Sequence, residues 1–341
     1  MLAEAAAGDN FVQLDIAAWV WLATIVAILL LLLFDILVLH RKPKVPKVRR
    51  AVIETMCWSL VGVAFGLVVL AGYGSAAGSE WFAGWLIEYS LSIDNVFVWA
   101  LILTKFRVPG EYQHRVLFWG VFGALVLRAA FVFAGVALVE RFEVTLFIFG
   151  GFLLYTSAKL LFSAGEESDP TQGRFYRGIT RFIPTSGELD GQKLFTTINA
   201  KRVATPLFAV LLLVEATDVL FAVDSVPAVL AVSNEQFIVF TSNAFAIMGL
   251  RSLYFLLADM HARFSALQQG LAVILAFVGI KMIISRWYQI DTAVSLLVIA
   301  LVLGASVAFS LHRIRNETTI GIESLESETP VLEELPPIHE R

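Results

Sequence analysis

Runs of about 20 apolar residues recur along this chain between residues 18 and 311, and they constrain its fold more than any other feature. Each run is long enough to cross a hydrocarbon core roughly 30 Å thick as a helix. Backbone groups in lipid must form their hydrogen bonds within the segment, which favours helices. Only 16% of the residues are charged, whereas about 25% is usual for a soluble domain. We therefore expect an all-α, polytopic membrane protein.

The apolar runs predict about nine membrane spans joined by polar segments. Their expected ranges are about 18–39, 51–72, 80–104, 114–138, 143–162, 204–231, 236–257, 264–284 and 292–311. The predicted organisation is a two-helix region (1–79), a three-helix unit (80–162), a cytoplasmic connecting segment (163–203), a second three-helix unit (204–284), a ninth helix (285–311) and an acidic tail (312–341). The tail has no apolar periodicity, so we expect it to be disordered.

Lysine and arginine gather on one side of the predicted membrane. The segment HRKPKVPKVRR (40–50) carries six of them and the connection 163–203 carries six more, whereas the opposite side has only Arg141 and Arg286. The positive-inside rule then places the N-terminus outside and the C-terminus in the cytoplasm. Within the connection, RFYRGITRF (174–182) predicts either a helix on the inner membrane surface or an ordinary loop helix.

Two stretches with the same order of charged residues indicate an internal repeat. Aligning SIDNVF (92–97) with AVDSVP (222–227) gives the order carboxylate, arginine, lysine over three spans in each unit. The matched pairs are Glu88 with Asp218, Asp94 with Asp224, Arg128 with Arg251, and Lys159 with Lys281. Because each unit has an odd number of spans, the second enters the membrane upside down. This pattern predicts a 3+3 inverted repeat with a substrate site near the midplane.

Five acidic side chains fall within the predicted spans: Glu88, Asp94, Glu215, Asp218 and Asp224. A charge at the centre of a membrane helix costs around 2.5–3.5 kcal/mol, so each needs compensation. A single buried carboxylate is more often a proton relay or a structural ion pair, but five on two mirrored helices favour a path for cations. All five histidines lie at span ends or in tails, so the ligands are oxygens. Such a set suits Mn²⁺, Ca²⁺ or Mg²⁺ rather than Zn²⁺.

Further residues of the two acidic spans are candidate ligands. Pro227 removes one amide donor and frees a carbonyl near Val223. Asn95 and Ser225 directly follow the two paired aspartates. One straight helix cannot aim both Glu88 and an aspartate six residues later at a single ion, because they lie about 9 Å apart on faces roughly 120° apart.

Four basic residues within the spans are expected to compensate the carboxylates: Arg128, Arg251, Lys159 and Lys281. As structural ion pairs they would hold the unloaded site together. The alternative is that they compete with the ion for the carboxylates and help to release it. Asp35 and Glu54 fall at the cytoplasmic ends of the first two spans, where a charge reaches water and needs no such partner.

Three long stretches resemble the TerC family of bacterial integral membrane proteins: EYSLSIDNVFVWALIL (88–103), TPLFAVLLLVEATDVLFAVDSVPAVLAVS (205–233) and TSNAFAIMGLRSLYFLL (241–257). The order of spans and the RKP segment are similar to the Alx branch. The resemblance covers nearly the whole chain except the acidic tail and the first few residues. It implies a nine-span inner-membrane protein related to the LysE superfamily of exporters, linked to manganese efflux and alkaline pH, with metal bound at the same five acidic residues.

The sequence thus predicts a secondary exporter of Mn²⁺ that works by alternating access, with protons as the counter-ion. No nucleotide-binding P-loop pattern is present, so ATP is not expected as the direct energy source. The alternatives are a Ca²⁺/H⁺ exchanger and a membrane scaffold that delivers metal to secreted enzymes through contacts with export machinery. Contacts between copies of the chain also stay open. An enzyme and a nucleic-acid partner are not expected.

Overall fold

The computed structural model describes residues 11–35, 37, 48–142, 144–162, 189–198, 201–257, 265–285, 287–288 and 290–327. Within these ranges the side chains of Asp94, Lys201, residues 265–268 and residues 311–327 are outside the description. The stretch 174–182, for which a surface helix is predicted, and residues 328–341 of the acidic tail lie outside the described residues.

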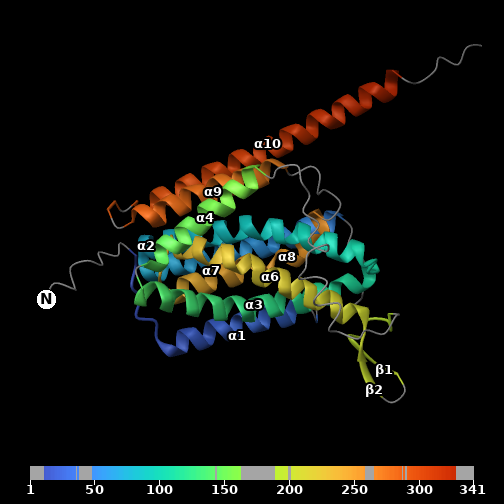
Figure 1. Ribbon diagram of the computed structural model, residues 1–341, viewed down its shortest axis with the longest axis horizontal. Helices are drawn as coiled ribbons and strands as arrows, with labels where there is room; N and C mark the ends of the chain where they lie inside the picture. The colour runs from blue at the N-terminus through green and yellow to red at the C-terminus, as the bar shows by residue number, and fades with distance from the viewer. Residues whose placement is uncertain are drawn as a thin grey trace, which may run out of the picture.

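Helices make up nearly all of the described chain (Figure 1). They are α1 (Ala18–Phe34), α2 (Val48–Lys105), α3 (Gly110–Arg141), α4 (Val144–Phe162), α6 (Pro206–Leu230), α7 (Gln236–Met248), α8 (Leu250–Leu257), α9 (Ser265–Ile284) and α10 (Thr292–Ser327). Two short strands, β1 (Phe195–Ile198) and β2 (Lys201–Ala204), form an antiparallel hairpin. The prediction of an all-α polytopic membrane protein is confirmed, with this hairpin as an addition that we did not expect.

The predicted spans coincide with helices, but two differences in helix boundaries have clear physical causes. Predicted spans 51–72 and 80–104 lie in one helix, α2, which is broken at Gly74 (φ 91°, ψ 176°). A glycine adopts this backbone conformation without the steric penalty of a Cβ atom. Span 236–257 is divided into α7 and α8, which are bent by 40° relative to each other.

Five described helices are long and apolar enough to cross a membrane, and a sixth is obtained if α7 and α8 count as one bent span. Two shorter apolar helices, Ala18–Phe34 and Gln269–Ile284, add to these. Nine spans and an inverted repeat therefore stay predictions. The tail differs from its prediction, because α10 continues as a helix to Ser327. Glutamate is a good helix former, so an established helix extends readily into this segment.

The helices form two groups that lie side by side (Figure 1). In the larger group α2 packs against α7 and α8, and α3 packs against α6. In the smaller group α4 packs against α9, which also contacts α10. Gly150 and Gly279 allow the close approach of α4 and α9, since a Cβ atom on either would lie 2.9 Å from the carbonyl oxygen of the other.

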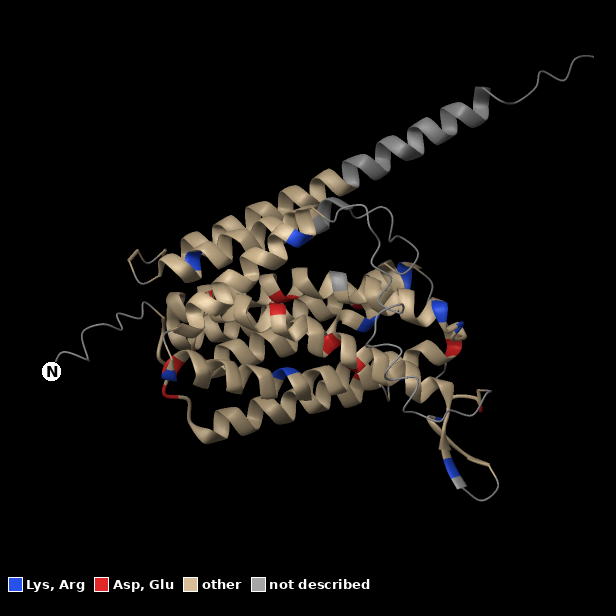
Figure 2. Cartoon of the chain, viewed as in Figure 1, with Lys and Arg blue, Asp and Glu red and all other residues tan. Residues whose placement is uncertain are grey.

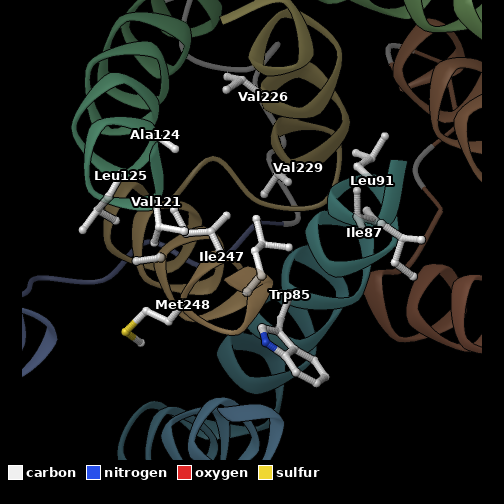
Figure 3. Close-up of a cluster of buried hydrophobic side chains, with 14 of the residues drawn as sticks. Trp85, Ile87, Leu91, Val121, Ala124, Leu125, Val226, Val229, Ile247 and Met248 are labelled. Atoms are coloured by element: carbon white, nitrogen blue, oxygen red, sulfur yellow. The ribbon is translucent and has the colours of Figure 1, made fainter. Parts of the chain in front are cut away.

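Large apolar side chains fix the acidic helices α2 and α6 in place. Figure 3 shows Trp85, Ile87 and Leu91 of α2 near side chains from α3, α6 and α7 in one buried cluster. The indole nitrogen of Trp81, also on α2, donates a hydrogen bond of 3.0 Å to Thr241 Oγ1 on α7. Buried aromatic side chains contribute large apolar areas and one polar atom that needs a partner. This core positions the charged residues described below.

The hairpin continues directly into α6. Thr205, which joins β2 to α6, is buried, and its hydroxyl donates to the carbonyl oxygen of Lys193 at 2.7 Å. Its backbone amide donates to the carbonyl oxygen of Leu194 at 3.0 Å. The hairpin protrudes from one end of the bundle (Figure 1). These bonds tie the base of the hairpin to the first turn of the helix that carries three of the candidate carboxylates.

The segment before α1 lies at the opposite end, where it is held by two carboxylates. The amide of Val12 donates to Glu80 Oε1 at 2.8 Å, and the amide of Leu14 donates to Glu235 Oε2 at 3.1 Å. Glu80 also accepts a hydrogen bond from Ser233 at 2.6 Å. Lys and Arg are more frequent at the hairpin end, which agrees with the predicted cytoplasmic side (Figure 2). The orientation itself stays a prediction.

Candidate functional site

Arg128 lies at the centre of the bundle and joins the two acidic helices. It extends from α3, and its side chain is 1% exposed. It forms ion pairs with Glu88 of α2 and with Asp218 of α6. The contacts to Asp218 are bidentate, with Nε 3.3 Å from Oδ2 and Nη2 3.2 Å from Oδ1. A bidentate guanidinium–carboxylate pair fixes both distance and orientation, so α3 holds α2 and α6 in a defined register.

Two neutral side chains complete the surroundings of this guanidinium. Nη1 of Arg128 lies 3.4 Å from Ser225 Oγ on α6. With the amide of Asn95 turned so that its oxygen faces α3, that oxygen accepts from Nη2 at 3.0 Å and its nitrogen donates to the carbonyl of Leu91 at 3.2 Å. This assignment satisfies the amide at both ends.

Glu88 is oriented by two further residues that the sequence did not single out. Ser92 Oγ donates to Glu88 Oε1 at 3.1 Å, and Asn243 Nδ2 of α7 donates to Glu88 Oε2 at 3.0 Å. All three side chains are buried. The amide oxygen of Asn243 has no hydrogen-bond partner in the described part of the chain. The sequence did offer a signal for Asn243, because this asparagine lies inside the predicted membrane span 236–257.

Asp224 lies beside this network and opens onto a small cavity. Thr156 of α4 donates to Asp224 Oδ1 at 3.1 Å. The cavity has a volume of about 70 Å³, and α2, α4, α6 and α9 all contribute to its wall. Its lining residues are Leu91, Asn95, Thr156, Leu160, Phe221, Asp224, Ser225, Leu271 and Leu275. The cavity therefore combines apolar walls with four oxygen-bearing side chains.

Glu215 lies apart from the Arg128 network, against α3. Its Oε1 is 2.0 Å from where a Cβ atom on Gly123 would be, so the carboxylate in this position uses the space left by the glycine. Oε2 of Glu215 is buried and has no hydrogen-bond partner among the described residues. A buried carboxylate oxygen without a partner is unfavourable, so this half-buried side chain is a candidate for binding a cation.

The remaining candidate ligands of the acidic helices are placed as follows. Asp94 lies on α2, but its side chain is outside the description. The Val223 side chain is exposed on the surface of α6, and the helix continues past Pro227 to Leu230. Within the described residues, no three Asp, Glu, His or Cys side chains come close enough together to hold one metal ion. The five predicted carboxylates are therefore not brought into a single centre by the side chains that the structure describes.

The predicted compensating residues divide between the centre and the two ends. Arg128 contacts Glu88 and Asp218, and the exposed side chain of Lys159 interacts electrostatically with Asp224. Arg251 differs from its prediction, because it forms its ion pair with Asp35 at the end of α1.

Lys281 also differs, because it donates a 2.9 Å hydrogen bond to Ser295 and interacts with Glu80 and Asp291. These two cations therefore do not reach the central carboxylates. Asp35 and Glu54 are themselves buried, contrary to the expectation that they reach water at the ends of their spans. The reason is that α8, which carries Arg251, packs against α2 and covers them.

Comparison with known proteins gives both a family and close relatives. Residues 73–318 match the model of the integral membrane protein TerC family. An uncharacterized membrane protein from Myxococcus xanthus is 45% identical over 299 residues, which cover 88% of this chain and 94% of that relative. A protein of Escherichia coli K12 with the name "Putative membrane-bound redox modulator Alx" is 43% identical over 293 residues, covering 82% of this chain and 89% of the relative.

A third relative, an uncharacterized membrane protein from Rickettsia bellii, is 36% identical over 82% of this chain and 92% of its own length. No solved structure matches the chain. The family match covers well over half of the residues, including α3, α4, α6, α7, α8 and α9 and the part of α2 that carries Glu88. The chain therefore belongs to the integral membrane protein TerC family.

Proposed function

We propose that this protein is a secondary transporter that exports a divalent metal ion, with Mn²⁺ as the first candidate, through carboxylates at the centre of the helical bundle. Protons are the proposed counter-ion, because a carboxylate that releases a metal ion in an apolar interior takes up a proton more readily than it stays charged. The five carboxylates Glu88, Asp94, Glu215, Asp218 and Asp224 remain the proposed ion path.

The observation that carries the proposal is the cavity beside Asp224. Its volume of about 70 Å³ compares with roughly 30 Å³ for one water molecule in the liquid, so it has room for an ion with part of its hydration shell. Asn95, Thr156, Asp224 and Ser225 offer oxygen atoms from three helices. Oxygen ligands and retained water are what Mg²⁺, Mn²⁺ and Ca²⁺ prefer in proteins.

A second observation supports a path rather than a closed site. Glu215 lies nine residues before Asp224 on α6, which is about 13 Å along a regular helix. Its buried oxygen without a hydrogen-bond partner provides a second position for a cation or proton on the same helix. Ionisable residues within membrane helices are rare and mark ion pathways and proton relays. Two such positions along α6 support stepwise movement of an ion through the bundle.

Flux measurements on purified protein in liposomes test the proposal. We expect a pH gradient to drive Mn²⁺ across the membrane, and we expect Asp224→Asn to lower the initial rate at least tenfold. Asp224→Glu keeps the charge and should retain part of the rate. Glu111→Gln is the matched control, because Glu111 is an exposed carboxylate in the first turn of α3. Unchanged flux in Asp224→Asn would refute the assignment.

Competition experiments then separate the two ion choices. An excess of Ca²⁺ that suppresses Mn²⁺ flux and is itself transported would favour a Ca²⁺/H⁺ exchanger. If no divalent ion crosses the membrane at all, the scaffold alternative gains support. That alternative predicts that deleting the connecting segment 163–203 or the tail 312–341 removes function in cells without changing ion flux.

A further inference from the structure

The guanidinium of Arg128 is surrounded by oxygen atoms on every side from which it can donate. A guanidinium has five N–H donors. The five oxygen atoms that face them are Asp218 Oδ1, Asp218 Oδ2, Glu88 Oε1, Ser225 Oγ and the amide oxygen of Asn95. We call these four residues the oxygen cage. Two of its members are carboxylates, so the cage has more negative charge than Arg128 has positive charge.

A cage of this kind has the composition of a site for a hard divalent ion. Such ions take six to eight oxygen ligands in proteins, from carboxylates, amide and backbone carbonyls, hydroxyls and water. The cage offers carboxylate, amide and hydroxyl oxygens, and all four of its side chains are nearly inaccessible to solvent. Arg128 reaches it from α3, whereas the cage itself is built by α2 and α6.

The cage adjoins the cavity, because Asn95 and Ser225 belong to both. An ion in the cavity would therefore lie next to the guanidinium. A divalent cation and a guanidinium that lie side by side in a poorly solvated interior repel each other strongly. Occupation of the cavity by a divalent ion and of the cage by Arg128 is consequently antagonistic.

One further polar atom points to a second occupant of the cage. The amide of Asn243 holds Glu88 through its nitrogen, while its own oxygen is buried and has no hydrogen-bond partner in the described part of the chain. Buried polar atoms are almost always satisfied, so an exception needs an explanation. This oxygen beside Glu88 is therefore available to a cation or a water molecule that reaches it.

We propose that the oxygen cage is a second cation position of the transport path and that Arg128 is its tethered occupant, which a divalent ion displaces. This inference rests on the proposed function, since it concerns how the same path loads and releases its ion. Arg128 offsets part of the negative charge of the two carboxylates between transport cycles. Its return to the cage drives the bound ion out, because guanidinium and ion compete for the same oxygens.

The test is equilibrium binding of Mn²⁺ to purified protein in lipid nanodiscs. Arg128→Lys keeps the charge but replaces five donors in a fixed fork by a single ammonium group, which is a weaker occupant. We expect its Kd for Mn²⁺ to fall about tenfold, because a competitor lowers apparent affinity by the fraction of time that it occupies the site. We expect its maximal flux to fall as well, because the ion leaves more slowly.

Arg251→Lys is the matched control. Arg251 is also buried and paired with a carboxylate, Asp35, but it does not contact the cage. We expect its Kd for Mn²⁺ to equal that of the unmodified protein. An unchanged or higher Kd in Arg128→Lys, or an equal decrease in both variants, would overturn the inference.

A second measurement covers the case in which Arg128 is needed for folding. Arg128→Gln removes the charge, and added Mn²⁺ should then raise its thermal midpoint by more than that of the unmodified protein, because the ion replaces the missing cation. An equal increase in both proteins would contradict the proposal. The two hypotheses can fail separately. Mn²⁺ flux that depends on Asp224 would support the transport function. An unchanged Kd in Arg128→Lys would then refute only the proposed role of the oxygen cage.

Discussion

Arg128 and Arg251 occupy matching positions in the two predicted repeats, yet they have different partners. Arg128 binds Glu88 and Asp218, one from each acidic helix, next to a cavity. Arg251 binds Asp35, which ends α1 and lies outside both repeats. Both arginines are buried. The same residue type at the same place in a repeat thus joins the two acidic helices in one case and attaches a peripheral helix in the other.

This difference indicates that the arginine at the centre of the bundle and the arginine at one end have different roles. The central arginine is surrounded by groups that a metal ion also prefers, so its contacts are exchangeable. Arg251 is accompanied by Glu54, which has a second partner in Arg50 at 2.7 Å. Its cluster connects α1, α2 and α8 and has the composition of a fixed structural joint. Four variants or conditions test this comparison.

The largest expected effect is that of Arg128→Ala. The substitution leaves Glu88 and Asp218 buried without their shared cation, and loss of one partner of a buried pair costs about 3–5 kcal/mol. We expect a marked decrease in the thermal midpoint in detergent, together with loss of Mn²⁺ flux. A stable variant would show that the central pair contributes little, and the two arginines would then be equivalent.

Arg251→Ala should have a smaller effect. Glu54 keeps Arg50, so the main loss is the pair with Asp35, for which about 1.5–3 kcal/mol is reasonable. We expect lower thermal stability but an unchanged Kd for Mn²⁺ in the fraction that stays folded. Altered metal affinity in this variant would place the Arg251 cluster on the ion path. Arg128 and Arg251 would then not differ in role.

Gly123→Ala tests whether Glu215 belongs to the central region. The new Cβ atom would lie 2.0 Å from Glu215 Oε1, so the end of this flexible side chain must move, with little loss of stability. We expect a partial decrease in Mn²⁺ flux, with the Arg128 network intact. Gly151→Ala on α4 is the control, because a Cβ atom there has no neighbour within 4 Å. Equal flux in both variants would exclude Glu215 from the path.

The smallest effect concerns an exposed carboxylate, which provides a baseline for the buried ones. Hydrogen bonds from Thr196 and Lys193 lower the pKa of Asp190 below its usual value of 3.8. Because the folded-state pKa is depressed, the contribution to stability is present above the unfolded pKa and is lost as pH falls through the folded one. Amide hydrogen exchange in β1 and β2 should therefore accelerate at low pH, below about pH 4.

Asp190→Asn provides the comparison for this pH effect. The amide cannot titrate, so its exchange rates should show no such acceleration beyond that of an unstructured reference peptide. Identical pH profiles in the two proteins would mean that Asp190 does not stabilise the hairpin.

The sequence predicts the helices well because lipid imposes one simple rule on every span. Apolar runs of the required length coincide with α3, α4, α6 and α9 to within a few residues. The position of the break in α2 is harder to predict, since Gly74 and Gly78 both fall in the expected loop 73–79. Only the backbone shows that Gly74 is the one with positive φ. The strands had a local signal in Phe195 to Ile198, which are one aromatic and three β-branched residues, but the predominance of helices obscured it.

The contacts of the charged side chains are harder to predict than the helices. Spacing along one helix gives the level and face of a residue, but not the helix that lies opposite. The repeat predicts equal roles for Arg128 and Arg251, whereas α8 turns Arg251 towards α1 and α2 because of the bend after α7. Asn243 was missed for the same reason. Its importance comes from its position opposite Glu88, which only the packing of α2 against α7 establishes.

The junction between the hairpin and α6 makes it possible to follow or restrain α6 through the hairpin. Thr205 bonds to the two residues just before β1, and it is the N-cap of the helix that carries Glu215, Asp218 and Asp224. An antibody fragment that binds the two strands would therefore hold a segment that is joined directly to the helix with the acidic residues. Such a fragment binds from the aqueous phase and would report any tilting of α6. A fragment that binds rigidly would prevent that tilting.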